Sequence, residues 1–176
     1  MGRPKALVTD ADGTAWVTRS AAVLAAGGCD PVLVVVGASA DRAAALVPPG
    51  ARWVEAVVWA EGMGASLRSG LAELVRSVPD DVVAAVVGLV DTPAVSAEVV
   101  SRLVTAARSA GPAGLARAAY AGEPGHPVVL GRDHWAAVAA SAHGDAGARA
   151  YLRGREVTPV ECGDVGDGRD VDSPQP

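Results

Sequence analysis

Two nearly continuous apolar runs, Val32–Val36 and Val82–Val90, place the strongest constraint on the fold of this chain. A strand with one face in water alternates apolar and polar side chains, so an unbroken run of Val, Leu and Ala predicts a strand buried on both faces. Helical apolar spacing lies between and after the runs, as in Ser66–Val78 and Ser96–Ala110. Strands that alternate with helices favour an α/β fold, a doubly wound and mostly parallel sheet.

The rest of the chain continues this alternation. Further helices are expected at 17–26, 40–47, 132–141 and 146–152, and further strands at 53–58, 115–120, 128–130 and 157–161. Residues 163–176 are rich in Gly, Asp and Pro and predict a loop-like tail. Because no long linker interrupts the pattern, residues 1–176 are expected to form a single domain.

Charge and cysteine content exclude several function classes. The net charge is −5, with 15 Lys and Arg among 176 residues, and these lack the clustering expected of a nucleic-acid binder. No apolar run reaches the roughly 18 residues that span a membrane, and no signal peptide is recognised. Cys29 and Cys162 lack metal-ligand spacing, so reduced thiols in the cytoplasm are expected.

The candidate site residues follow the expected strands, where open parallel sheets bind ligands. Gly62, Gly64 and Ser66 lie at the start of a helix, whose free backbone N–H groups suit an anion or a polar ligand edge. The alternative is an ordinary strand-to-helix turn with Ser66 as the helix cap. Asp91, in Asp-Thr-Pro, suits a hard divalent cation, and its alternative is a turn that approaches the next helix.

Six short motifs, in order along nearly the whole chain, resemble those of MobA-like nucleotidyltransferases. They are Met1–Leu7 with Arg3 and Lys5, Trp59–Leu67 (Trp-x-x-Gly-Met-x-x-Ser-Leu), Asp91–Pro93, Gly125–Val128 (Gly-His-Pro-Val), Gly144–Arg149 and Asp170–Pro174. The branch that they resemble most is the molybdenum cofactor cytidylyltransferases. The resemblance implies a Rossmann-like nucleotidyltransferase fold and Mg²⁺-dependent transfer of a nucleotidyl group from a nucleoside triphosphate, with CTP favoured, to a phosphorylated acceptor such as a molybdopterin-type cofactor.

The resemblance also assigns roles to residues. Asp91 is the first expected metal ligand and Asp172 a second. Lys5, assisted by Arg3, would neutralise the triphosphate and the leaving pyrophosphate. Gly62, Gly64, Ser66 and His126 would lie beside the nucleoside or the acceptor, although His126 also fits a turn residue bonded to backbone. A molybdoenzyme client is an expectation from the family alone.

The sequence departs from the family pattern at its first residues. The family begins with a strand near Leu-Ala-Ala-Gly and a Gly/Ser-rich loop, whereas this sequence starts at the following Met, which suggests an N-terminally truncated domain. That strand would lie between Val32–Val36 and Val82–Leu89, so a gap is predicted there; direct pairing of the two would contradict truncation. The alternative function is a non-catalytic relative that binds a cofactor or a partner enzyme. Asp145 and Arg149 are expected to form an ion pair on one short helix.

Overall fold

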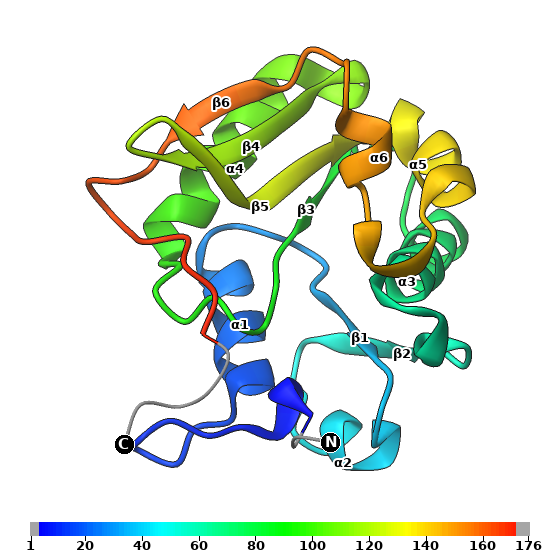
Figure 1. The fold of residues 1–176 in the computed structure, drawn as a ribbon, viewed down its shortest axis with the longest axis vertical. Coiled ribbons are helices and arrows are strands. Elements are labelled where there is room, and N and C mark those ends of the chain that lie inside the picture. The colour runs from blue at the N-terminus through cyan, green and yellow to red at the C-terminus, as the bar shows by residue number, and fades with distance from the viewer. Residues whose placement is uncertain (1–3, 172–176) are drawn as a thin grey trace.

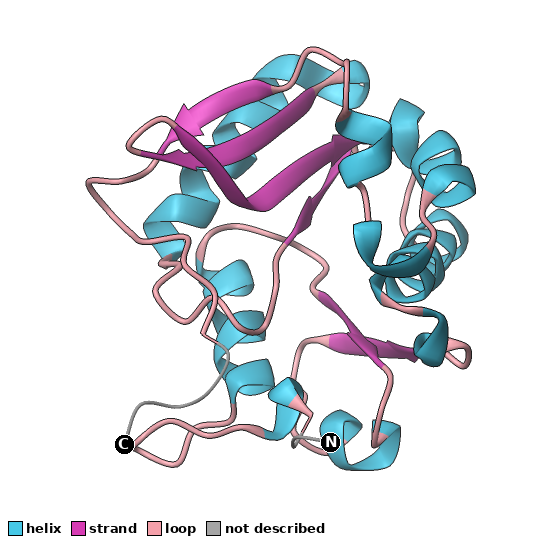
Figure 2. Ribbon diagram, viewed as in Figure 1, coloured by secondary structure: helices cyan, strands magenta, loops and turns pink. Residues whose placement is uncertain are grey.

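The computed structural model describes residues 4–171 and has an α/β architecture. Short 3-10 turns connect several of the main elements, and helices cover both faces of the larger sheet (Figures 1 and 2). The helices are α1 (Trp16–Ala26), α2 (Ala40–Ala44), α3 (Met63–Ser77), α4 (Ala97–Ala110), α5 (Trp135–Ser141) and α6 (Arg149–Leu152). The strands are β1 (Leu33–Val36), β2 (Arg52–Glu55), β3 (Ala84–Val87), β4 (Leu115–Tyr120), β5 (Glu123–Gly131) and β6 (Thr158–Glu161).

These strands form two sheets, of which the larger is of mixed direction, and this corrects the expectation of one mostly parallel sheet. A two-stranded sheet holds β1 and β2 in parallel, and a four-stranded sheet has the order β3-β5-β4-β6. Within the larger sheet β5 runs antiparallel to both β3 and β4, whereas β4 and β6 are parallel.

A tight turn explains the antiparallel pairing. Ala121 and Gly122 join β4 to β5 with φ angles of 54° and 82°. Two successive positive φ angles are typical of a two-residue hairpin, which reverses the chain at once and leaves no room for a crossover helix. The strand expected at 128–130 therefore begins earlier, at Glu123.

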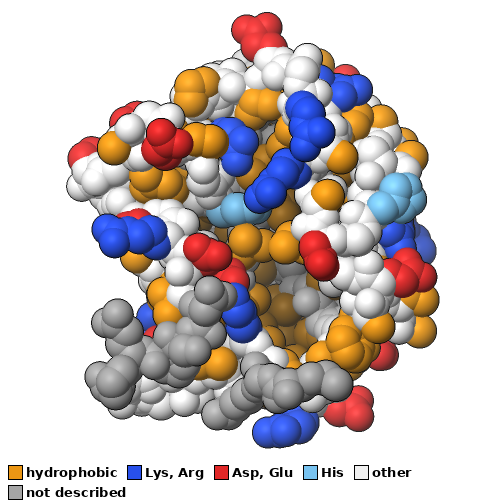
Figure 3. All heavy atoms as spheres, viewed as in Figure 1, with side chains coloured by type: hydrophobic (Ala, Val, Ile, Leu, Met, Phe, Trp, Pro, Cys, Tyr) orange, Lys and Arg blue, Asp and Glu red, His pale blue; other side chains and the backbone are white. Residues whose placement is uncertain are grey.

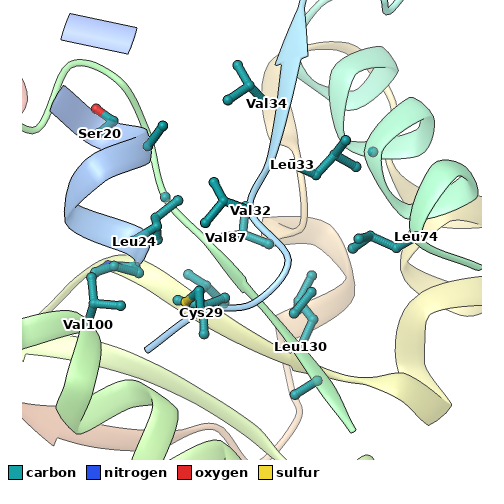
Figure 4. Close-up of a pocket in the computed structure, with 18 of the residues that line it drawn as sticks. Ser20, Leu24, Cys29, Val32, Leu33, Val34, Leu74, Val87, Val100 and Leu130 are labelled. Carbon is teal, nitrogen blue, oxygen red and sulfur yellow. The ribbon is translucent and has the colours of Figure 1, made fainter. Parts of the chain in front are cut away.

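A slot separates the two sheets, as the sequence predicts. Among the described residues β1 and β3 do not pair; instead both line a cavity of about 780 Å³. Figure 4 shows apolar side chains of Leu33, Val34 and Val87 around this space, with Cys29 nearby. Leu33 and Val34 are only half-buried, so the expectation of a strand covered on both faces is wrong for the middle of β1.

The main core lies on the two faces of the larger sheet. One face packs against α3, α5 and α6 around Leu130 and Trp135, and the other packs against α4 around Val129 and Leu103. All four side chains are at most 1% exposed. A smaller cluster of Leu7, Val36 and Ala43 supports β1.

The loop after β6 returns across the beginning of α4. The Ser96 hydroxyl donates to the Val165 carbonyl oxygen at 2.9 Å, and the Val171 N–H donates to the Asp91 carbonyl oxygen at 2.8 Å. Arg102 forms a two-pronged contact with the Asp164 carboxylate, 2.7 Å for each bond. Through these bonds, residues 163–171 are held against α4 and against the turn that follows β3. Across residues 4–171, no helix has the length and apolar character needed to cross a membrane.

Candidate functional site

An ion pair between Lys5 and Asp91 marks the end of β3. Lys5 Nζ lies 2.7 Å from Asp91 Oδ2, although the two residues are 86 positions apart in the sequence. The Asp91 side chain is 17% exposed and the Lys5 side chain 38%, so Asp91 does not point into the packed interior. Solvent reaches both groups, so each can release the other and bind a ligand in its place. The carboxylate can bind a cation, and the ammonium group can bind a phosphate.

Local bonds hold Asp91 in place. The Thr92 hydroxyl donates to the Leu89 carbonyl oxygen at 2.9 Å, which closes the turn after β3. The Asp91 carbonyl oxygen accepts the Val171 N–H from the returning tail. Val90, Thr92 and Pro93 line the cavity, so the turn that carries Asp91 forms part of its margin.

The glycines before α3 allow close packing. Gly62 adopts φ 106°, and a Cβ built on it would lie 2.6 Å from the Asp145 Oδ1 and from the Gly144 backbone. A Cβ on Gly64 would lie 2.8 Å from the backbone of Ala142 and His143. Close packing therefore explains why glycine occupies both positions. The ligand-binding role of the two glycines stays a prediction.

Ser66 lies in the second turn of α3 rather than at its cap. The helix begins at Met63 with Gly62 as the N-cap residue, so the alternative of a Ser66 cap is wrong. Ser66 is half-buried and lines the same cavity as His126. Ser66 is thus part of the cavity wall, and its contact with a ligand stays a prediction.

His126 lies on β5 and lines the same cavity. Its carbonyl oxygen accepts the Tyr120 hydroxyl at 2.8 Å, and its Nδ1 is buried without a hydrogen-bond partner among the described residues. Burial lowers the pKa of His126; a hydrogen bond to the Val87 backbone and the charge of Asp91 oppose this, while Arg117 and Arg149 add to it. The ring is therefore held toward its neutral form, and Asp91 lies near enough to act on it.

The expected ion pair between Asp145 and Arg149 is absent from the described structure. Asp145 lies in the 3-10 turn Gly144–Ala146, Gly147 follows with φ 50°, and Arg149 begins a separate helix, α6. The positive φ breaks the helix that would have brought the two side chains together. Arg149 instead follows Gly147 and Ala148, which line the cavity, and its charge lowers the pKa values of Arg117 and His126.

Four of the eight predicted site residues lie at or beside one cavity. Lys5 contacts Asp91, while Ser66 and His126 line the adjoining cavity. Arg3 and Asp172 lie outside the described residues. Among residues 4–171 no group of three or more His, Cys, Asp or Glu side chains is placed to hold a metal ion. Arg117 was missed by sequence reasoning, because an isolated arginine within an apolar strand carries no motif.

Comparison with known proteins decides the family. The model of the MobA-like NTP transferase domain matches residues 1–160, which is most of the chain. The chain belongs to this family. Its MobA-like fold is shared with the crystal structure of Rv0371c from Mycobacterium tuberculosis H37Rv, at a TM-score of 0.73 and 26% identity over 92% of this chain and 80% of that one.

Two further comparisons bear on chemistry. Rv0371c has also been crystallised in complex with manganese, and that structure matches at a TM-score of 0.70 and 26% identity over 91% of this MobA-like chain and 82% of that one. Nicotine blue oxidoreductase from Paenarthrobacter nicotinovorans is 35% identical over 186 residues, covering 98% of this chain and 86% of that protein. The MobA-like family is thus shown, while the cytidylyltransferase branch stays a prediction.

Proposed function

We propose that this chain is a metal-dependent nucleotidyltransferase that moves a nucleotidyl group onto a phosphorylated small-molecule acceptor and releases pyrophosphate. The observation that carries the proposal is the 2.7 Å contact between Lys5 and Asp91 at the margin of a cavity shared by Ser66 and His126. Membership of the MobA-like family supports the reaction class.

Asp91 is the described side chain at this margin that would hold a magnesium ion. Mg²⁺ at such sites uses one or two carboxylates together with phosphate oxygens and water, and Asp91 supplies one partly exposed carboxylate. Asp172 is proposed as the second, because it directly follows Val171, whose N–H bonds to the Asp91 backbone. When bound, the metal supplies charge neutralisation for the phosphates. The manganese-bound relative is consistent with a divalent ion.

The remaining residues bind and orient the reactants. Lys5 would leave Asp91 and neutralise the triphosphate, and then the leaving pyrophosphate, as a compact charge. Arg3 is proposed to assist it. The start of α3 with Gly62, Gly64 and Ser66 would lie beside the nucleoside or the acceptor, as would His126.

The finer assignments rest on the motif resemblance. They are CTP as the donor, a molybdopterin-type acceptor, a molybdoenzyme as the client and a cytoplasmic location. The experiment is calorimetric titration with CTP, GTP and ATP in the presence of Mg²⁺, followed by assay of pyrophosphate release. Absence of binding by all three nucleotides would remove the proposal for this chain and leave its alternative, a non-catalytic cofactor-binding or partner-binding relative.

We also propose that the slot between β1 and β3 has room for one further parallel strand. The support is that both strands present an edge to the same apolar cavity, and unpaired strand edges are unfavourable. A Leu-Ala-Ala-Gly strand with a Gly/Ser loop, fused before Met1, should raise the melting temperature and slow thiol labelling of Cys29. An extension of equal length with Asp in place of the apolar residues should do neither; equal behaviour of the two would reject the proposal.

Oxidoreduction is a second candidate function, favoured by the 35% identity to nicotine blue oxidoreductase. The two candidates separate in one assay. Consumption of a reduced nicotinamide cofactor in the presence of an aromatic dye, without pyrophosphate release from any nucleotide, would favour oxidoreduction over nucleotidyl transfer.

A further inference from the structure

One face of the larger sheet carries two basic side chains at the place where the core ends and the cavity begins. Arg117 on β4 is paired in register with Val128 on β5, and His126 lies two residues before Val128. Residues directly opposite each other on paired strands present their side chains to the same face. Val128 packs in the core and also lines the cavity, so Arg117 lies on the face that borders the cavity, and His126 lines the same cavity.

Both side chains carry a buried polar atom that the described protein leaves without a partner. These atoms are Arg117 Nε and His126 Nδ1. An unsatisfied buried donor or acceptor costs about 1–3 kcal/mol, and more when the group is charged. Two such atoms on neighbouring strands are therefore a costly arrangement unless something else bonds to them.

A third cation adds to the cluster. Gly147 and Ala148 line the cavity, and Arg149 follows them at the start of α6. Burial lowers the pKa of Arg117 and the charge of Arg149 lowers it further, so the two guanidinium groups repel each other. Neither arginine forms an ion pair with a carboxylate of residues 4–171. Figure 3 shows Lys and Arg side chains gathered beside a histidine at the edge of the hollow.

We propose that Arg117, His126 and Arg149 form a subsite for a phosphate group, the phosphate of the acceptor molecule. Guanidinium groups bind phosphate through paired N–H bonds, and an anion here would satisfy the buried atoms and offset the repulsion between the arginines. The subsite adjoins the Lys5–Asp91 pair, because His126 lines the same cavity as Val90 and Thr92, the chain neighbours of Asp91. The acceptor therefore presents a phosphate monoester, and this inference rests on the proposed nucleotidyl transfer.

The test measures phosphate binding without any nucleotide. Inorganic phosphate is titrated into the full chain while the His126 ring resonances are followed by NMR; the chain has three histidines, which makes assignment direct. We expect saturable shifts of His126. Arg149→Gln, which removes one exposed charge, should weaken phosphate binding about 10-fold or more, the scale of one charged hydrogen bond. Arg117→Gln should do the same, with a thermal melt to verify folding.

A matched control makes the result decisive. Arg153→Gln removes the same charge a few residues further along and should keep wild-type affinity at His126 within a factor of about two. Equal weakening by Arg149→Gln and Arg153→Gln, or no His126 shift with the wild type, overturns the subsite. Acetate that competes as well as phosphate overturns the phosphate assignment. Phosphate binding that depends on Arg149, without nucleotide turnover, would reject the proposed function and leave the subsite standing.

Discussion

The two sheets differ in how completely their strands are covered. In the larger sheet β5 has a partner on each side and buries Val129 and Leu130 to 1% or less. In the smaller sheet β1 has one partner, its middle residues are half-buried, and Trp53 on β2 is 51% exposed. The same kind of Val-rich sequence thus forms a sealed core in one region and a cavity wall in the other. The difference is set by neighbours, because apolar burial requires surfaces on both faces and both edges.

The largest expected effect contrasts one leucine from each region. Leu130→Ala should lower the free energy of unfolding by about 3–4 kcal/mol, since the side chain is fully buried and its removal leaves a cavity. Leu33→Ala should cost less than about 1.5 kcal/mol, because Leu33 already borders an open space. Urea denaturation followed by circular dichroism measures both. Equal losses would mean that the slot is closed in solution.

A second prediction concerns α3, which packs on β1 and on α5. Gly64→Ala should lower the free energy of unfolding by about 1–3 kcal/mol. The added Cβ would lie 2.8 Å from backbone atoms of Ala142 and His143, and backbone atoms cannot move aside as the end of a flexible side chain can. Gly88→Ala is the matched control, since its Cβ would meet only a Leu24 methyl at 3.9 Å, an ordinary contact. Thermal melts of both variants test this, and a neutral Gly64→Ala would show that the loop at 142–145 is free to move.

Activity at the junction of the two regions gives a third prediction. Asp91→Asn should reduce nucleotide-dependent pyrophosphate release at least about 100-fold, because a neutral amide is a poor ligand for a hard divalent cation. Asp80→Asn removes an exposed carboxylate of the same type and should leave the rate unchanged. Rates are compared at saturating Mg²⁺. Similar rates for Asp91→Asn and wild type would remove Asp91 from the metal site.

The smallest effect concerns pH and the β4–β5 hairpin. Glu161 accepts the backbone N–H groups of Gly163, Gly122 and Ala121, and these bonds lower its pKa below the ordinary 4.5. A lowered folded-state pKa contributes stability that is present above pH 4.5 and is lost as the pH falls through the folded value. Glu161→Gln should therefore flatten the decline of stability below pH 4.5. Urea denaturation midpoints at several pH values measure this decline, with Glu123→Gln in the same hairpin as the control. Parallel curves of midpoint against pH for wild type and Glu161→Gln would contradict the prediction.

Sequence reasoning located the elements better than their directions. The apolar runs at 32–36 and 82–90 contain β1 and β3, and the gap between these strands was correctly predicted. The antiparallel pairing of β5 was missed, because Ala-Gly is a weak hairpin signal compared with Asn-Gly. Positive φ at such a turn is decided by the strands that flank it.

Side-chain neighbours in the site were only partly predictable. Lys5 and Asp91 were assigned to one site from the motifs, without an expected contact between them, and the structure pairs them; Asp145 and Arg149 were expected to pair and do not. Sequence spacing presumes a continuous helix, and Gly147 ends it. Arg117 became visible only when β4 placed it beside His126, since its relevance comes from contacts between strands.

The returning C-terminal loop has a practical consequence for biochemistry on this protein. Because Arg102 anchors Asp164 and Val171 bonds to the backbone of Asp91, the last described residue lies beside the proposed metal ligand. A purification handle or a fluorescent fusion at the C-terminus would extend the chain beyond a segment that is bonded to the Asp91 backbone. Assays that use such a fusion should be compared with material from which it has been cleaved, before a slow turnover is attributed to the enzyme.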